Sequence, residues 1–321
     1  WRDSPDSISG LRNQRSDLLI HFFGSFSMQG EGKELSPHAD LLENGAIGIA
    51  EANSTPPASL IRKGLLINEI GQNPLFFAPR DQEIQDNGIV REGVETLRAG
   101  WAPDPFESET LPLSQLLVLQ EQYPNSLIRL MNISTAAGVS ILENSLVNPM
   151  TSVCWWNLIS DNSNLSLSDM GWKVIPSLGT PKDRKALIKG LLKETITGVS
   201  VNAIALDDSE VKRPINQRLP GISGYHLVLP LLWQELVIKS GWKVEKLWDI
   251  LSFGPSKMLG TPLESLKENS NRWLIFDPNK KWIQNINRKT PKTAFNQPFE
   301  GKEISGKVIE CGIKVPETLS Y

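Results

Sequence analysis

Two adjacent carboxylates, Asp207 and Asp208, follow an almost unbroken apolar run that begins at Val199. An apolar run between turn signals is typical of a strand buried on both faces, so we predict a strand over Val199–Leu206. In α/β barrels the C-terminal end of such a strand is where catalytic groups lie. A carboxylate there can take up and release a proton, or bind a hard cation through oxygen. Asp207 is therefore the first candidate for chemistry.

Histidines, the usual partners of such an acid, are scarce. The chain has three, His21, His38 and His226, and they lie far apart in the sequence. The pattern places His21 inside a strand, as a hydrogen-bonded core residue, and His38 at a helix start on the surface. His226 opens a helix after Gly224 and is the histidine expected nearest a ligand. Three scattered histidines cannot form a two-zinc site.

Short apolar runs alternate with helix-period segments as far as Asp208, which predicts repeated βα units and a parallel sheet. The predicted strands are Leu18–Phe23, Ala46–Ala50, Leu75–Ala78, Leu127–Asn132, Thr151–Trp156 and Val199–Leu206. The predicted helices between them are Pro57–Ile70, Leu113–Gln122 and Pro181–Glu194.

The clearest helix start lies at Thr180, which is predicted to cap the helix that follows. Pro181 occupies the first helical position and Asp183 the capping-box position. The apolar face predicted toward the sheet consists of Leu187, Ile188 and Leu191.

The character of the chain changes after Asp208. A loop rich in Pro and Gly is predicted over Pro214–Gly224, and helices follow at Leu227–Lys239 and Val244–Leu251. Beyond Gly260, alternating pieces predict a small antiparallel sheet, built from Trp273–Phe276, Trp282–Ile286 and Ile304–Ile309. We therefore expect a barrel over residues 1–260 and a small β-domain with a tail over residues 261–321.

Charge and composition exclude several classes of protein. The 321 residues carry a formal net charge of -3 and no long Lys/Arg block, so neither nucleic acid nor a membrane is an expected partner. No segment approaches the roughly 20 apolar residues of a membrane span, and no signal peptide is expected. Two cysteines, Cys154 and Cys311, are too few for a disulfide framework, so a cytoplasmic protein is expected.

Several segments together resemble the dihydroorotase branch of the cyclic amidohydrolases. They are Gly221–Gly224 with Leu229–Leu232, then Leu251–Gly260, Phe276–Pro278 and Asn296–Val308, and upstream Asn132–Val139, which is similar to the family's His-Val-Ser-Thr turn. The resemblance implies an α/β fold, a distorted (β/α)8 TIM-type barrel with a small β-sandwich portion at the C-terminus. It also implies hydrolysis of the cyclic amide of dihydroorotate with one or two zinc ions.

In that chemistry the metal lowers the pKa of bound water to about 7, and an aspartate passes the proton to the leaving nitrogen. Asp207 matches this aspartate, at the tip of the penultimate barrel strand. Asp208 stands where a histidine normally follows, and Val211 where another histidine helps to hold substrate.

The resemblance places unexpected residue types at the metal positions. Ala78 and Asn132 align with two metal-binding histidines, and Trp156 with one of a further pair. The acidic bridging ligand aligns with Glu51, or with Ala52 after a one-residue slip. The family's first barrel strand, with its His-x-His pair, is absent, so the barrel is expected to be incomplete at the N-terminus.

The candidate metal ligands are thus Glu51, Asp207 and Asp208, and the candidate substrate contacts are Asn132, Trp156, Gly221 and His226. Trp155 and Trp156 are expected to fill the vacated metal pocket or to stack on a planar ligand, with only one ring pointing inward because strands alternate faces. An ion pair between Arg80 and Asp81 is expected across the same site.

Two functions remain in competition. The first is a dihydroorotase homologue of pyrimidine biosynthesis that has no functional zinc centre and serves as a non-catalytic partner of another protein. By analogy with inactive dihydroorotase-like proteins, that protein is aspartate transcarbamoylase, and the chain is expected to form a homo-oligomer. The second is an active cyclic amidohydrolase that uses zinc, with Asp207 as acid/base and Glu51, Asn132 and Asp208 as substitute ligands. A small-molecule sensor that uses the old pocket is a third possibility.

Overall fold

Six short parallel strands form the centre of the computed structural model, which describes residues 1–12, 20–164, 172–268, 270, 272–286 and 294–313. Strands β1, β2, β3 and β6 pair in that order, β7 pairs with β8, and a parallel bridge between Leu130 and Thr151 joins the two groups. Their bounds are β1 (Gly24–Ser25), β2 (Ile49–Glu51), β3 (Leu75–Phe77), β6 (Ile128–Leu130), β7 (Ser152–Cys154) and β8 (Gly198–Ser200).

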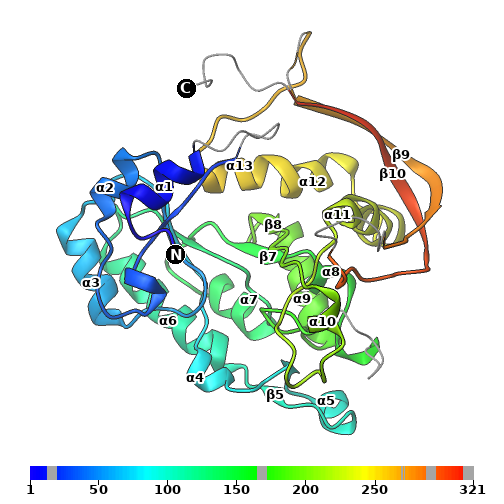
Figure 1. Ribbon diagram of the computed structural model, residues 1–321, viewed down its shortest axis with the longest axis horizontal. Coiled ribbons are helices and arrows are strands. Elements are labelled where there is room, and N and C mark those ends of the chain that lie inside the picture. Colours follow the sequence, from blue (N-terminus) through cyan, green and yellow to red (C-terminus); the bar gives the residue numbers. More distant parts are fainter. Residues whose placement is uncertain (13–19, 165–171, 269, 271, 287–293, 314–321) are drawn as a thin grey trace.

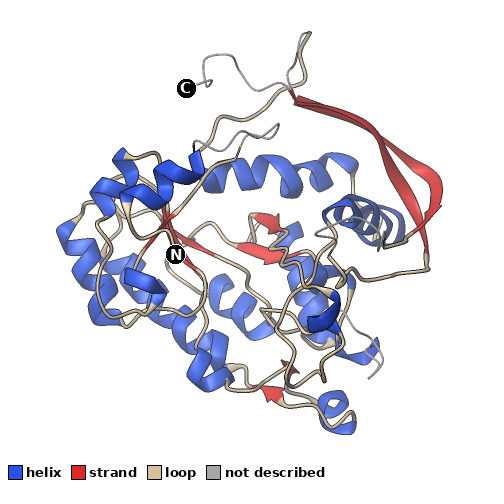
Figure 2. Ribbon diagram, viewed as in Figure 1, coloured by secondary structure: helices blue, strands red, loops and turns tan. Residues whose placement is uncertain are grey.

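Helices cover the outside of these strands (Figure 2). Parallel neighbours need long crossovers, and here the crossovers carry the helices. The apolar core lies between the two layers, where Ile49, Phe77 and Ile128 are fully buried. The helices are α1 (Pro5–Arg12), α2 (His38–Glu43), α3 (Ala58–Ile67), α4 (Gln82–Gln85), α5 (Val94–Arg98), α6 (Glu107–Gln122), α7 (Ala136–Glu143), α8 (Trp156–Ile159) and α9 (Pro181–Leu192), with 3₁₀ turns at Met28–Gly30 and Asn162–Asn164.

Helix α9 confirms the predicted helix start. The Thr180 side chain accepts a hydrogen bond from the Asp183 backbone N–H, and the Asp183 carboxylate accepts one in return from the Thr180 N–H, at 2.7 Å. Leu187 and Leu191 are fully buried, and Ile188 packs against the core at its edge. The capping box and the apolar face thus hold α9 against α7 and α8.

Strand β8 is shorter than predicted. It ends at Ser200, because its partner β7 ends at Cys154 and offers no further ladder. The chain then turns at Asn202, whose φ is 41°, and Ile204 is 43% exposed. The predicted strand over Val199–Leu206 is therefore wrong beyond Ser200.

Other boundaries also differ from the predictions. Trp155 forms a turn and Trp156 starts α8, so both lie outside strand β7. Residues 20–23 form no strand, although the carbonyl of Phe22 accepts from Ile47 N–H at 2.9 Å; residues 18 and 19 of that predicted strand lie outside the described residues. Helix α6 begins six residues before Leu113, at Glu107.

The chain from β8 to Gly260 carries a series of short helices. Its elements are α10 (Asp208–Val211), α11 (Tyr225–Leu232), the π-helix η3 (Trp233–Lys239), α12 (Val244–Trp248), the π-helix η4 (Asp249–Phe253) and α13 (Gly254–Leu259). The backbone of Gly254 passes so close to β8 that a Cβ there would lie 2.1 Å from the carbonyl oxygen of Thr197. Glycine is what lets this helix and strand approach each other.

A long antiparallel ribbon ends the described chain. Strands β9 (Arg272–Ile283) and β10 (Glu303–Ile313) pair with each other and lie at the edge of the molecule beside α11 (Figure 1). The predicted pieces Trp273–Phe276 and Trp282–Ile286 are not separate, since β9 runs through Pro278, which an edge strand tolerates, and β9 ends at Ile283, so the last three residues predicted as strand are not in it.

The architecture is an incomplete (β/α)8-type barrel with a small antiparallel sheet at its C-terminal side. A second, two-residue parallel pair, β4 (Val90–Arg91) with β5 (Pro103–Asp104), lies in the crossover between β3 and β6. None of the helices in the described ranges is long and apolar enough to cross a membrane. The division into residues 1–260 and 261–321 stays a prediction.

Candidate functional site

A cavity of about 120 Å³ lies at the C-terminal ends of the barrel strands. Parallel strands end at the same edge, so residues that follow β2, β3, β6 and β8 meet there. The polar lining is rich in amides and includes two arginines and two carboxylates. Its residues are Ala52, Asn53, Ala78, Pro79, Arg80, Gln85, Arg91, Asp104, Ser108, Glu109, Met131, Asn132, Ile175, Pro176, Asn202 and Ile204.

Three of the lining residues are the predicted metal-ligand positions Ala52, Ala78 and Asn132. The alanine methyl groups carry no donor atom. The Oδ1 of Asn132 already accepts a hydrogen bond from Ser200 Oγ at 2.5 Å. Asn132 also has a φ of 61°, a conformation that costs a non-glycine residue energy and is often found at functional sites.

Glu51 is not one of the lining residues. The next residue, Ala52, lines the cavity instead. Glu51 is 2% exposed, and its Oε2 accepts from Ser27 Oγ at 2.8 Å and from Ser27 N–H at 3.2 Å. Burial raises the pKa of the Glu51 carboxyl, and the two hydrogen bonds from Ser27 lower it by less. The Glu51 carboxylate thus binds Ser27, which lies two residues after the end of β1.

Asp207 and Asp208 lie at the start of α10, and neither lines the cavity. Asp207 caps this helix, since its Oδ1 accepts from the Glu210 N–H at 2.8 Å and from Ser209 Oγ at 2.7 Å. These hydrogen bonds lower the pKa of the Asp207 carboxyl, chiefly the one from Ser209. Asp208 pairs with Lys212 one turn along the helix.

The donor set does not fit a zinc ion. Zinc sites use imidazole, thiolate or carboxylate groups that converge at about 2 Å. In the part of the chain that the structure describes, no three His, Cys, Asp or Glu side chains are grouped so that they could hold a metal. At the cavity itself, Ala52 and Ala78 offer no ligand and Asn132 offers an amide oxygen that is already engaged.

The other predicted contact residues lie near the cavity or away from it. Gly221 lies beside Ile204, one of the lining residues; a Cβ added at Gly221 would lie 3.0 Å from the Cβ of Ile204. Trp156 is 1% exposed and donates its indole N–H to the carbonyl of Pro176 at 3.4 Å. Trp155 is equally buried, so both rings fill the core; the alternation argument failed because neither residue is in a strand.

The histidines also lie away from the cavity. His226 contacts Gln284 Oε1 through Nε2 at 2.9 Å and packs against Trp282 of β9, which makes it part of the ribbon interface. His38 is buried at 2% exposure, with Nε2 2.8 Å from the carbonyl oxygen of Phe26, so the expected surface role is wrong. His21 is exposed and in no strand, which reverses its expected core role.

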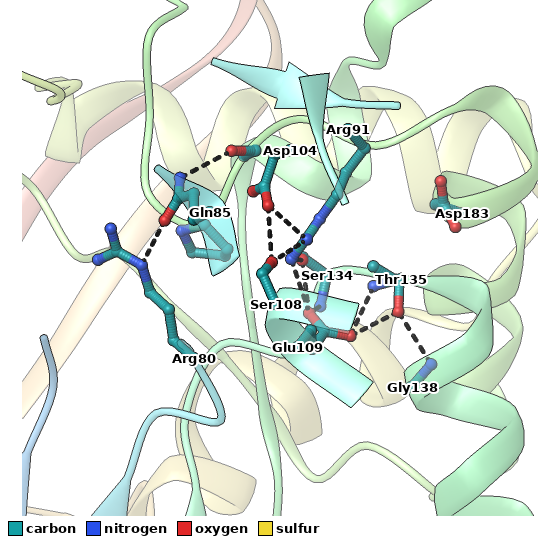
Figure 3. Close-up of polar contacts among 12 residues, drawn as sticks. Arg80, Gln85, Arg91, Asp104, Ser108, Glu109, Ser134, Thr135, Gly138 and Asp183 are labelled. Atoms are coloured by element: carbon teal, nitrogen blue, oxygen red, sulfur yellow. Dashed lines mark hydrogen bonds and ion pairs between the residues drawn. The ribbon is translucent and has the colours of Figure 1, made fainter. Parts of the chain in front are cut away.

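A buried ionic cluster around Arg91 forms one wall of the cavity (Figure 3). Arg91 Nη1 lies 3.0 Å from Asp104 Oδ1, and Nη2 lies 3.4 Å from Glu109 Oε2. All three side chains are at most 3% exposed. The Glu109 carboxylate also accepts four hydrogen bonds, from the backbone N–H and the hydroxyl of both Ser134 and Thr135, at 2.6–3.1 Å.

Sequence reasoning missed this cluster. Arg91 and Asp104 come from the short strands β4 and β5, and Glu109 from the first turn of α6. The turn at Ser134-Thr135 was noticed for its family likeness, but its carboxylate partner lies 25 residues upstream. The sequence signal that could have indicated the cluster is the carboxylate of Glu109, close to the start of α6.

Arg80 also lines the cavity. Its Nε donates to Gln85 Oε1 at 2.7 Å (Figure 3), and Gln85 in turn donates to Ser177 Oγ at 3.3 Å. Asp81 caps α4 instead, accepting from the Glu83 and Ile84 N–H groups, so the expected Arg80–Asp81 ion pair is wrong. Burial lowers the pKa of Arg80 to about 10, which leaves the guanidinium charged at neutral pH.

The two cysteines differ in reactivity. Cys154 is fully buried at the end of β7, and burial raises the pKa of its thiol to about 12. Cys311 is exposed on β10. A thiol reacts as its thiolate, so Cys154 is inert at neutral pH.

Comparison with known proteins explains this arrangement of strands and cavity. No protein-family model matches the chain. A "probable dihydroorotase-like protein" of Synechocystis sp. is 32% identical over 310 residues, which covers 93% of this chain and 68% of that relative. The chain belongs to the dihydroorotase-like family. A dihydroorotase of Thermus aquaticus is 25% identical over 289 residues, covering 86% of this chain and 68% of the relative.

Solved structures share the fold. The L-hydantoinase (dihydropyrimidinase) from Arthrobacter aurescens superposes with a TM-score of 0.77 at 15% identity, covering 97% of this chain and 72% of that one. The Saccharomyces cerevisiae dihydroorotase, solved in complex with 5-fluoroorotic acid, gives a TM-score of 0.66 at 15% identity, covering 92% and 82%. The incomplete barrel of this dihydroorotase-like chain is therefore an amidohydrolase fold.

Glu51 supplies a first testable prediction. Its folded-state pKa is raised above the ordinary 4.5, so the folded protein favours the protonated form. Its contribution to stability is therefore present below the ordinary pKa and is lost as the pH rises through the raised folded-state pKa. We expect Glu51→Gln to remove this loss, so that the variant gains stability relative to wild type as the pH rises above the ordinary pKa of 4.5.

Glu51→Ala is the contrasting variant. It leaves the N–H and hydroxyl of Ser27, a fully buried residue, without their acceptor, so we expect a loss of about 1–3 kcal/mol in the free energy of unfolding. Urea titrations of the three proteins across this pH range measure both effects. Parallel pH profiles for wild type and Glu51→Gln would show that the carboxyl does not titrate as described.

Proposed function

We propose that this chain is a dihydroorotase homologue of pyrimidine biosynthesis that works without a zinc centre, as a non-catalytic partner of another protein. The observation that carries the proposal is the composition of the cavity at the strand ends. Ala52, Ala78 and Asn132 meet there, and together they offer a metal one amide oxygen that is already bonded to Ser200. Hydrolysis of an unactivated ring amide needs an activated water, and these side chains cannot bind the metal that would supply it.

The position of Asp207 supports the same proposal. An acid/base must come within hydrogen-bonding reach of the reacting group. Asp207 instead caps α10, and its pKa is held below the usual range by Ser209 and Glu210 N–H. A carboxylate with a lowered pKa is a weaker base, so this environment suits a structural cap.

The β9–β10 ribbon is the surface that best fits a protein partner. Leu274, Ile275 and Ile309 are 43%, 51% and 47% exposed on it. Leu274 and Ile275 are neighbours in β9 and point to opposite faces, so the ribbon exposes apolar side chains on both faces to a partner. We propose aspartate transcarbamoylase as the partner, within a homo-oligomeric assembly, on the analogy of inactive dihydroorotase-like proteins.

The test is co-purification of the native protein with aspartate transcarbamoylase from the same organism, followed by size-exclusion chromatography and metal analysis. We expect a stable complex, no stoichiometric zinc and no turnover of dihydroorotate. Zinc at one or two equivalents with turnover that a chelator abolishes would overturn the proposal, as would the absence of any complex.

Asp207→Asn separates the scaffold from the enzyme. Asparagine also caps helices, so α10 is retained and we expect little change in melting temperature. A scaffold should keep its partner with a dissociation constant within about twofold of wild type, a change too small to signal a lost contact. A metal enzyme should instead lose nearly all of its dihydroorotate turnover, which a direct assay on both proteins measures.

A further inference from the structure

The outer face of α9 carries a row of lysines. Residues that recur at spacings of three and four lie on one face of a helix. Leu187 and Leu191 occupy the face of α9 that packs into the core. The opposite face holds four exposed lysines, which we call the lysine row: Lys182, Lys185, Lys189 and Lys193.

Most of the lysine row has no counter-ion within the described residues. Lys193 pairs with Glu143 at 2.9 Å, and Lys189 lies within electrostatic range of the same carboxylate. Lys182 and Lys185 have no carboxylate oxygen within 4 Å in the described part of the chain. Like charges three or four residues apart repel one another along a helix. Negative charge from another molecule would relieve this repulsion.

The segment between β3 and β6 carries the opposite charge. Apart from Asp81, whose carboxylate caps α4, it has five exposed or half-buried carboxylates against one exposed guanidinium, that of Arg98. Figure 1 shows α4, β5 and α5 of this segment together at one end of the molecule. Only Glu95 has an ion pair among the described residues, with Arg98 at 2.9 Å. The five carboxylates are those of Glu83, Asp86, Glu92, Glu95 and Glu107.

The acidic segment adjoins the start of α9. Val90 of β4 forms a parallel bridge with Leu178, two residues before the cap of α9. A Cβ added at Gly93 would lie 3.4 Å from Cγ2 of that cap, Thr180. Glu92, next to Gly93, and the lysine row therefore belong to neighbouring elements, and charges of both signs lie side by side on the protein surface.

Two apolar side chains lie on the same acidic segment. Val94 and Leu97 of α5 are 64% and 71% exposed, and their spacing of three residues places them on one side of the helix. Exposed ion pairs alone contribute little affinity, whereas apolar side chains buried in a contact contribute more. This surface combines both kinds of group.

From this arrangement we propose that α9 and the acidic segment form the contact between two copies of this chain. In a two-fold dimer the same surface of each copy is used, so the lysine row of each copy meets the carboxylates of the other. The proposal rests on the homo-oligomeric part of the proposed function. It uses a different surface from the β9–β10 ribbon.

The distribution of charge along the chain favours a second copy as the occupant. The formal net charge is only -3, yet residues 1–121 contain nine more acids than bases, and residues 173–321 contain eight more bases than acids. A second copy thus offers each surface its opposite charge. Complementary potentials of this kind fix which surfaces meet and in which orientation.

Sedimentation velocity of the full chain tests the proposal. At about 50 μM protein and about 50 mM NaCl we expect a species with twice the 35.7 kDa mass of the chain. At about 1 M NaCl, where the Debye length is about 3 Å, the dissociation constant should rise by about tenfold or more. A wild type that is monomeric under both conditions would overturn the proposal together with the homo-oligomer.

Charge reversal locates the contact. Lys185→Glu with Lys189→Glu places acid against acid, and Glu92→Lys with Glu95→Lys places base against base, so each double variant should sediment as a monomer. An equimolar mixture of the two should restore the dimer, because both halves of the two-fold contact again bring opposite charges together. A mixture that stays monomeric would overturn the proposal.

Arg62→Glu with Lys63→Glu is the matched control. It makes the same change in charge on exposed side chains of α3, on the opposite side of the molecule from α9 (Figure 1), and should dimerise within about twofold of wild type. Circular dichroism checks the folding of each variant. A dimer of unchanged affinity in Lys185→Glu with Lys189→Glu would show that the copies meet through another surface. A monomeric wild type that binds heparin through α9 would assign the lysine row to a polyanion and overturn the proposal.

Discussion

Arg91→Leu is expected to lower the free energy of unfolding by about 3–5 kcal/mol, the cost of removing one partner from a buried ion pair. Arg91, Asp104 and Glu109 are at most 3% exposed, so water cannot replace the lost guanidinium. The variant leaves two carboxylates in the interior with only neutral donors. Urea denaturation followed by circular dichroism measures the loss.

An exposed arginine pair on α5 provides the matched control for this substitution. Arg98→Leu makes the same substitution at an exposed pair on α5 and should change stability by less than about 0.5 kcal/mol. A loss in Arg98→Leu as large as that in Arg91→Leu would mean that burial of the ion pair does not set the cost.

Gly254→Ala is expected to destabilise the protein by about 3 kcal/mol, at the upper end for overpacking a core. The new methyl would lie 2.1 Å from the carbonyl oxygen of Thr197, which is backbone and cannot rotate away. Helix α13 and strand β8 must then separate. The backbone of Gly254 has an ordinary helical φ of -58°, so steric overlap alone is tested.

Gly10→Ala is the matched control for this contact. Gly10 also lies in a helix, α1, but a Cβ there meets nothing within 4 Å. Alanine should stabilise that helix by roughly 0.5–1 kcal/mol. Thermal unfolding of both variants compares them, and a Gly254→Ala protein as stable as Gly10→Ala would show that the helix and strand can move apart freely.

Local sequence patterns predicted the order of the βα units and the start of α9 because those features depend on neighbouring residues. Thr180, Pro181 and Asp183 form their capping box within four positions. The length of β8 was not predictable in the same way, since Val201–Leu206 is apolar but has no partner strand beyond Cys154. The end of a strand depends on its neighbour in the sheet. Here Ser200 pairs with Cys154, which lies 46 residues earlier in the sequence.

The cavity could be predicted only in part. The family resemblance named Ala78 and Asn132, and both line it. Arg80 was expected to pair with Asp81, but Asp81 caps α4, and the preference of a carboxylate for free helix N–H groups decided the outcome. The Arg91 cluster joins two short strands and a helix, so no single stretch of sequence contains it.

The contrast between the two thiols makes the ribbon easy to observe. At neutral pH a maleimide dye should react with Cys311 alone, because the Cys154 thiol is enclosed and almost entirely protonated. Cys311 pairs across the ribbon with Leu274, one of its exposed apolar residues. A single environment-sensitive fluorophore there would report directly on anything that covers this surface, without any engineered cysteine.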